Sequence, residues 1–142
     1  MKRILMMTAI IMTLPLIATA CGIGERTADG YENASVAHLH DHWQQGEKSP
    51  IPFMILDVRT PEEYAEGHIA GATLIPIQVL AERMNEVPKD KQVYVHCHSG
   101  ARSARAAKML AAKGYTRIEN VTGGIVAWKD AGYPVEKNTV VK

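Results

Sequence analysis

A chain of 142 residues with a formal net charge of +1 is long enough for one compact domain and too evenly charged to favour a polyanion as its partner. The composition therefore argues against nucleic-acid binding. Two cysteines could form one disulfide at most, so the fold cannot depend on a disulfide framework.

The first twenty residues predict an export signal rather than a part of the fold. Lys2 and Arg3 form a short basic start, an apolar run of fourteen residues covers 4–17, and small residues occupy 18–20. A helix that spans a membrane needs about twenty apolar residues, so this run is too short for one. We therefore expect a signal peptide over 1–20, with a retained membrane anchor as the alternative.

Cys21 follows the small residues directly, and the stretch 16–21 resembles a bacterial lipobox, in which the cysteine is acylated and becomes the mature N-terminus. Ala18 stands where leucine is usual, so plain cleavage before Cys21 is the alternative. The resemblance implies a protein exported to the bacterial periplasm and anchored to a membrane by a lipid on Cys21. Residues 21–34 are rich in glycine and charged side chains and predict a tether.

The rest of the chain alternates short apolar runs with helical patterns. Strands are expected over 53–56, 72–75, 92–96 and 117–121, and helices between Ser35 and Gly46, from Thr60 onward, and over 79–84, 102–113 and 125–130. Strands that are apolar on both faces and separated by helices predict a mostly parallel sheet covered on both sides. We therefore expect one α/β domain over 35–138, with about four to five strands and helices on both faces.

The loop after the strand 92–96 carries the strongest chemical signal, because it holds Cys97 between that strand and the next helix. Ligands of open parallel sheets bind beyond the carboxyl ends of the strands, which is where this loop lies. The small residues 99–101 allow the backbone to curl tightly and to point its N–H groups inward. A curled loop that leads into a helix N-terminus predicts an anion site.

Such a loop would activate Cys97 as a nucleophile. An ordinary cysteine has a pKa near 8.5, and lowering it by two units takes roughly 2.7 kcal/mol. A helix dipole supplies about 0.3–1 kcal/mol, and up to ~2 kcal/mol in favourable geometry. We therefore expect the loop amides and the guanidinium of Arg102 to contribute the rest. A buried structural cysteine is the alternative interpretation.

Four segments, in this order along the chain, resemble the single-domain rhodaneses, which are thiosulfate sulfurtransferases. The third of them is the loop Cys97-x-x-Gly100-x-Arg102, which is similar to the rhodanese active-site loop. The other three are Leu56-Asp57-Val58-Arg59 with Pro61-Glu62-Glu63-Tyr64, Gly67-His68-Ile69-Ala70-Gly71-Ala72, and Gly123-Gly124-Ile125-Val126-Ala127-Trp128. The resemblance covers about 35–136 and implies a rhodanese-like fold.

The resemblance also implies covalent catalysis in two steps. The Cys97 thiolate would attack the sulfane sulfur of thiosulfate, release sulfite and keep the sulfur as a persulfide, which cyanide or a thiol then takes. Arg102 would hold the sulfonate oxygens, and Asp57 with Arg59 would form a supporting ion pair near the loop. No cofactor and no metal is implied. The substrate-binding residues expected around Cys97 are His98, Ser99, Gly100, Ala101 and Arg102.

Two other classes of function use the same loop. A non-catalytic sulfur carrier or a redox-sensing module would use the thiol to serve a protein partner, which could also be the sulfur acceptor. Phosphatases and arsenate reductases of related fold place five residues between cysteine and arginine, whereas four lie between Cys97 and Arg102. The tighter ring suits a single sulfur atom and favours the sulfurtransferase.

Overall fold

A computed structural model of the chain describes residues 26–137. The predicted signal peptide, the predicted lipid on Cys21 and the first part of the predicted tether lie outside these residues. Within them, no helix combines the length and the apolar composition that crossing a membrane requires.

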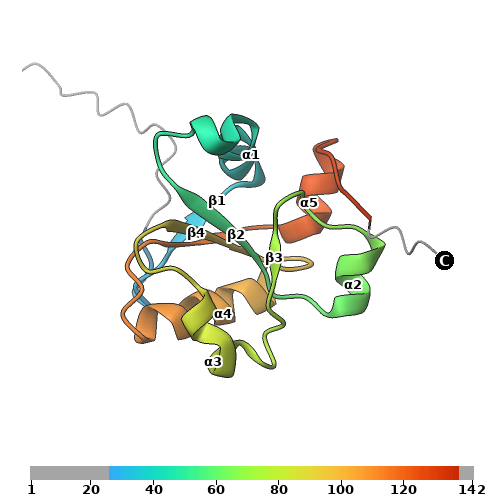
Figure 1. The fold of residues 1–142 in the computed structure, drawn as a ribbon. Coiled ribbons are helices and arrows are strands. Elements are labelled where there is room, and N and C mark those ends of the chain that lie inside the picture. Colours follow the sequence, from blue (N-terminus) through green and yellow to red (C-terminus); the bar gives the residue numbers. More distant parts are fainter. Residues whose placement is uncertain (1–25, 138–142) are drawn as a thin grey trace, which may run out of the picture.

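Five strands form one sheet in the order β1-β5-β4-β2-β3, and every neighbouring pair is parallel. Parallel neighbours cannot be joined by a tight turn, so the chain crosses over the sheet between them. This arrangement confirms the expected α/β fold with a mostly parallel sheet (Figure 1). The strands are β1 Glu32–Ala34, β2 Phe53–Asp57, β3 Thr73–Leu74, β4 Gln92–His96 and β5 Ile118–Val121.

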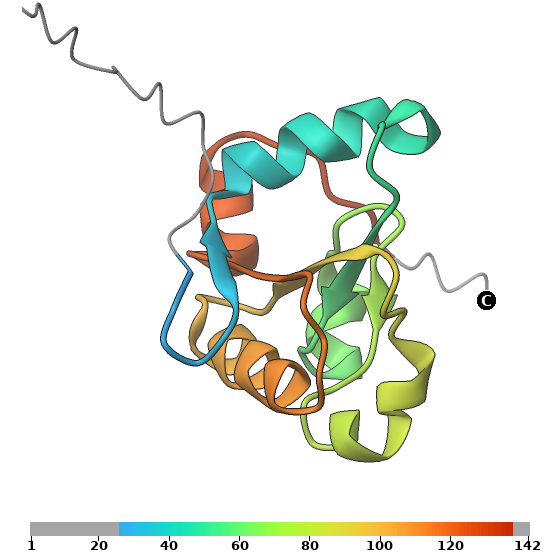
Figure 2. The ribbon, with the colours of Figure 1, turned by 90° about the vertical axis from the view of Figure 1, so that its left-hand side faces the viewer.

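Helices cover both faces of the sheet, with α1 and α4 on opposite sides (Figures 1 and 2). α1 and α2 begin where the sequence predicts them to begin: the Ser35 hydroxyl accepts the N–H of His38 at 3.1 Å, and Thr60 and Glu63 form a reciprocal capping box. The other three helices begin within one residue of the predicted start. The helices are α1 Val36–Gln45, α2 Pro61–Glu66, α3 Leu80–Arg83, α4 Ala101–Ala112 and α5 Gly124–Asp130, and 3₁₀ turns at Gly46–Lys48 and Met84–Glu86 follow α1 and α3.

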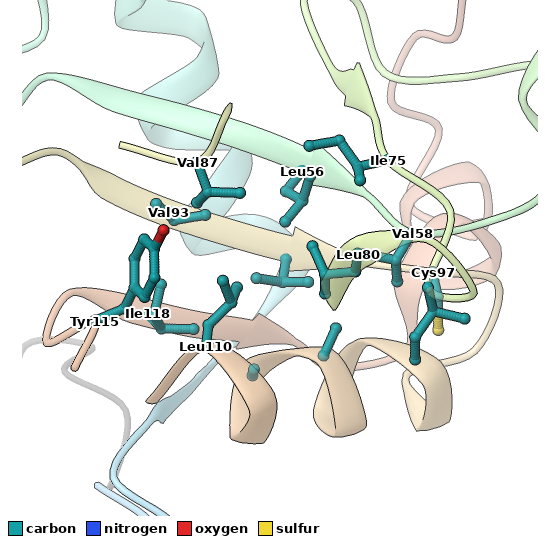
Figure 3. Close-up of a cluster of buried hydrophobic side chains, with 14 residues drawn as sticks. Leu56, Val58, Ile75, Leu80, Val87, Val93, Cys97, Leu110, Tyr115 and Ile118 are labelled. Atoms are coloured by element: carbon teal, nitrogen blue, oxygen red, sulfur yellow. The ribbon is translucent and has the colours of Figure 1, made fainter. Parts of the chain in front are cut away.

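Two hydrophobic clusters lie on the two faces of the sheet because successive strand residues point to opposite sides. Leu56 and Val95 face α3 and α4, whereas Ile55 and Tyr94 face α1 and α5. All four side chains are buried, which explains why β2 and β4 are continuous apolar runs. Cys97 belongs to the cluster that contains Leu56 and Val95, and it lies at the end of that cluster, just after β4 (Figure 3).

The N-terminal boundary of the domain differs from the one expected. Glu32–Ala34, assigned to the tether from composition, forms the edge strand β1, and its residues pair in register with Glu119, Asn120 and Val121 of β5. An edge strand is solvated along one side, so only Ala34 is buried and the segment carries almost no apolar signal. The folded domain therefore starts before Ser35.

Candidate active site

The loop that holds Cys97 is shaped by glycine at its end. Gly100 caps α4 with φ of 110°, a conformation that glycine adopts without the steric cost of a side chain. A Cβ at this position would lie 3.4 Å from the backbone nitrogen of Gly123, which is close to ordinary van der Waals contact, so the conformation of Gly100 and not the space around it favours glycine. The chain therefore turns sharply between the end of β4 and the first turn of α4, and the Cys97 side chain lies beside that turn (Figure 3).

The sulfur of Cys97 is surrounded by neutral hydrogen-bond donors. The backbone N–H of Gly100 donates to Sγ at 3.1 Å, and the Ser103 hydroxyl lies 3.5 Å from it. The same hydroxyl also lies 2.7 Å from Oδ1 of Asn120 and 3.0 Å from the Gly100 carbonyl oxygen, so its single proton is shared among three acceptors. The Asn120 amide group in turn donates to Asn33 on β1. Cys97 is only 1% exposed, so these donors act with little competition from water.

These contacts set the acidity of the thiol. Burial raises the pKa of Cys97, but the hydrogen bonds from the Ser103 hydroxyl and from the amides of Ser103, Gly100 and Ser99 lower it more, so the net pKa is below the ordinary value for cysteine. The pKa of the thiol is therefore lowered by the loop amides, as expected from the sequence, and by the Ser103 hydroxyl, which was not among the expected site residues. A serine in the first turn of the helix, three residues after the glycine cap, is the signal that could have found it.

Removing the Ser103 hydroxyl should make Cys97 less acidic. In Ser103→Ala the thiolate loses one donor while burial stays, so the pH profile of Cys97 alkylation by iodoacetamide should shift upward, and the rate at pH 7 should fall about threefold to tenfold. Ser99→Ala is the matched control, because it removes an exposed hydroxyl and keeps the Ser99 amide. Identical pH profiles for the two variants would show that the Ser103 hydroxyl does not act on the thiol.

The first turn of α5 holds the loop from the other side. The N–H groups of Ile125 and Val126, which have no partner within their own helix, donate to the carbonyl oxygens of Cys97 at 2.9 Å and of His98 at 3.2 Å. This approach depends on Gly124, where a Cβ would collide with the Cys97 carbonyl oxygen and lie 2.6 Å from that of His98. The glycine pair of the last rhodanese-like segment is therefore part of the site.

Arg102 lies in the first turn of α4 with its side chain partly exposed, at the solvent side of the Cys97 loop, which we call the mouth of the loop. Its partner is a carboxylate. Its two terminal nitrogens donate to the two oxygens of Glu63 on α2 at 2.6 and 2.7 Å. The pKa of Glu63 is held at about 2, first by this hydrogen bond, so the carboxylate is charged over the whole physiological range. The Arg102 guanidinium is thus bound by Glu63 and makes no hydrogen bond to the Cys97 sulfur. Its pKa is raised first by the hydrogen bond to Glu63 and also by the charge of Cys97, so the two groups of the loop interact through charge. The expected contribution of Arg102 to the activation of the thiol stays a prediction.

A buried ion pair supports α2 beneath the loop. Arg59 lies 2.6 Å from Asp57 and is 2% exposed, and it also donates to the carbonyl oxygens of Glu63 at 3.2 Å and Gly67 at 2.9 Å. These carbonyls belong to the C-terminal part of α2, where a cation is favoured. Asp57 lies next to His96 in the register of β2 and β4. The pair therefore connects the end of β2 to the helix that carries Glu63.

The remaining expected site residues lie on the solvent-facing side of the loop. His98, Ser99 and Ala101 are exposed, whereas Gly100 is half-buried and faces the sulfur with its amide. The His98 side chain is 59% exposed, and its Nδ1 lies 4.0 Å from a Glu63 oxygen. The substrate-binding roles of these residues and of Arg102 remain predictions.

These features together define a class of protein: an α/β domain with a hydrogen-bonded cysteine at the carboxyl end of its central parallel strand, in a loop that leads into a helix. The model of the rhodanese-like domain matches residues 35–131, and the chain belongs to the rhodanese-like family.

Known relatives agree with this assignment. The chain is 44% identical over 82 residues to a sulfurtransferase of Allochromatium vinosum, covering 58% of this chain and 77% of the relative. It is 39% identical over 84 residues to the thiosulfate sulfurtransferase PspE of Escherichia coli, with the same two coverages of 58% and 77%. The crystal structure of a rhodanese-related protein from Thermoplasma volcanium superimposes with a TM-score of 0.67 at 36% identity, covering 75% of this chain and 98% of that one.

Proposed function

We propose that this chain is a sulfurtransferase that moves sulfane sulfur from thiosulfate to cyanide or a thiol acceptor through a persulfide on Cys97. The observation that carries this proposal is the Cys97 sulfur, buried and hydrogen-bonded by the Gly100 amide next to the Ser103 hydroxyl. Donors of this kind favour an anionic sulfur, both as the attacking thiolate and as the persulfide that it becomes. The relatives named as sulfurtransferases support the same class of reaction.

Each step transfers one sulfur atom by nucleophilic displacement and needs no external oxidant or reductant. The Cys97 thiolate attacks the outer sulfur of thiosulfate, a new S–S bond forms, and the old S–S bond breaks as sulfite leaves with its electron pair. Cyanide then attacks the outer sulfur of the persulfide, thiocyanate leaves, and the Cys97 thiolate returns. A thiol, free or on a protein, takes the place of cyanide by forming a new persulfide.

Two measurements on the native chain test this proposal. Intact mass after treatment with thiosulfate should show a gain of one sulfur atom, and thiosulfate with cyanide should then give steady production of thiocyanate with ping-pong kinetics. A chain that gains one sulfur but does not turn over would be a carrier that serves a dedicated partner. A chain that gains no sulfur but releases phosphate from an aryl phosphate would belong to the phosphatase alternative.

The same mass spectrum also tests the predicted N-terminus. Export with lipid attachment, which we include in the proposal, predicts a chain that begins at Cys21 and carries the mass of a lipid, isolated with the membrane fraction. A chain that begins at Cys21 without added mass would indicate plain cleavage.

A further inference from the structure

Positive charge at the mouth of the Cys97 loop is matched by negative charge. Each terminal nitrogen of Arg102 donates one hydrogen bond to Glu63, in the two-pronged geometry that makes arginine–carboxylate pairs strong and well oriented, and the carboxylate offsets the charge of the guanidinium. Arg59, the next guanidinium along this edge of the sheet, is paired with Asp57. An anion that enters beside Arg102 therefore meets the Glu63 carboxylate as well as the guanidinium.

Glu63 is held in this position by its own helix. The N–H of Thr60 donates to Oε2 of Glu63 at 3.1 Å, which closes the capping box at the start of α2. The carbonyl oxygen of Glu63 also accepts from Arg59 at 3.2 Å. Because the side chain and the backbone are both tied down, swinging the carboxylate away from Arg102 would break contacts on which the start of α2 depends.

The donors at the sulfur itself carry no net charge. The Gly100 amide and the Ser103 hydroxyl can stabilise one anionic sulfur atom through their dipoles. Thiosulfate brings a further negative charge on its sulfonate, and the positive charge that would offset it is already balanced by the Glu63 carboxylate. A sulfur donor with only one negative charge does not need that positive charge.

We propose that Glu63 is a specificity-determining residue: by holding Arg102 it selects a sulfur donor with at most one negative charge over dianionic thiosulfate. Thiosulfonates and the persulfides of small thiols are donors of this class. The inference rests on the proposed function and names its preferred substrate class, with thiosulfate as a usable but weaker donor. With methanethiosulfonate, the Cys97 thiolate attacks the outer sulfur, the S–S bond breaks, and methanesulfinate leaves with the bonding electron pair.

The test compares thiosulfate with methanethiosulfonate, which has the same transferable sulfur and one negative charge fewer. The native chain should show the higher kcat/KM with methanethiosulfonate. Glu63→Gln keeps an oxygen for the Thr60 N–H but removes the charge, so kcat/KM for thiosulfate should rise about tenfold, mainly through KM, and that for methanethiosulfonate less than about threefold. The variant's KM for thiosulfate should also increase with ionic strength, because a freed guanidinium is screened by salt.

Two further variants make the result specific. Glu62→Gln removes the same charge from the neighbouring position of α2, where the side chain does not bind Arg102. It should leave kcat/KM for both sulfur donors unchanged. Glu63→Asp keeps the charge and should keep the preference for methanethiosulfonate. Thermal unfolding of each variant shows whether α2 is intact.

The outcomes separate the two proposals. If Glu63→Gln lowers kcat/KM for both donors alike, Glu63 only positions Arg102, and the inference is overturned while the sulfurtransferase stands. A native chain that prefers thiosulfate overturns the inference in the same way. A native chain that takes sulfur from neither donor overturns the proposed function, and the inference with it.

Discussion

Replacing Cys97 with serine should abolish sulfur loading and lower thiocyanate formation by more than about 1,000-fold. The serine hydroxyl fits the same loop and meets the same donors, the Gly100 amide and the Ser103 hydroxyl. Its oxygen does not ionise near neutral pH, however, and it cannot carry sulfur as a persulfide. Intact mass after thiosulfate treatment and steady-state thiocyanate production measure the two effects directly.

Cys21→Ser is the matched control, since it removes the only other cysteine of the chain. Sulfur loading and turnover should persist in this variant, whatever happens to membrane attachment. Full turnover by Cys97→Ser would mean that the buried thiol is structural, and the sulfurtransferase mechanism would have to be abandoned.

Gly124→Ala should damage both the stability of the domain and the shape of the Cys97 loop. The added Cβ would collide with the Cys97 carbonyl oxygen, and φ of +54° is a strained conformation for alanine. Strain and overpacking together should lower the free energy of unfolding by about 2–4 kcal/mol, which corresponds to a fall in Tm of about 10–20 °C. Thermal unfolding followed by circular dichroism measures this loss, and the alkylation rate of Cys97 reports the loop.

Gly114→Ala separates the collision from the backbone strain. Gly114 follows the C-cap of α4 with φ of +82°, and nothing lies within 4 Å of the Cβ that alanine would add. This variant should therefore lose only about 1 kcal/mol and keep the alkylation rate of Cys97 unchanged. Equal losses in the two variants would show that the contact between α5 and the Cys97 loop contributes nothing.

Features that depend on neighbouring residues could be predicted from the sequence. The caps Ser35 and Thr60 act within three residues of themselves, so the starts of α1 and α2 were predicted correctly. β4 is buried on both faces and therefore reads as a continuous apolar run, which placed Cys97 in the loop between a strand and a helix. The same reasoning failed at β1, because a short polar edge strand is formed by pairing with β5 rather than by its own composition.

The groups that surround Cys97 could be identified only from the folded chain. The candidate nucleophile, its loop and the class of sheet that carries it could be predicted from the chain alone, since all three depend on local pattern and on recognisable segments. Arg102 and Glu63 are 39 positions apart and meet only because β2 and β4 are neighbours, which brings the residues after their carboxyl ends together. Ser103 and Asn120 are likewise joined by packing of α4 against β5. Spacing along the chain does not reveal such contacts. The pairing of Arg102 with Glu63, and the charge balance that follows from it, could therefore be seen only in the folded structure.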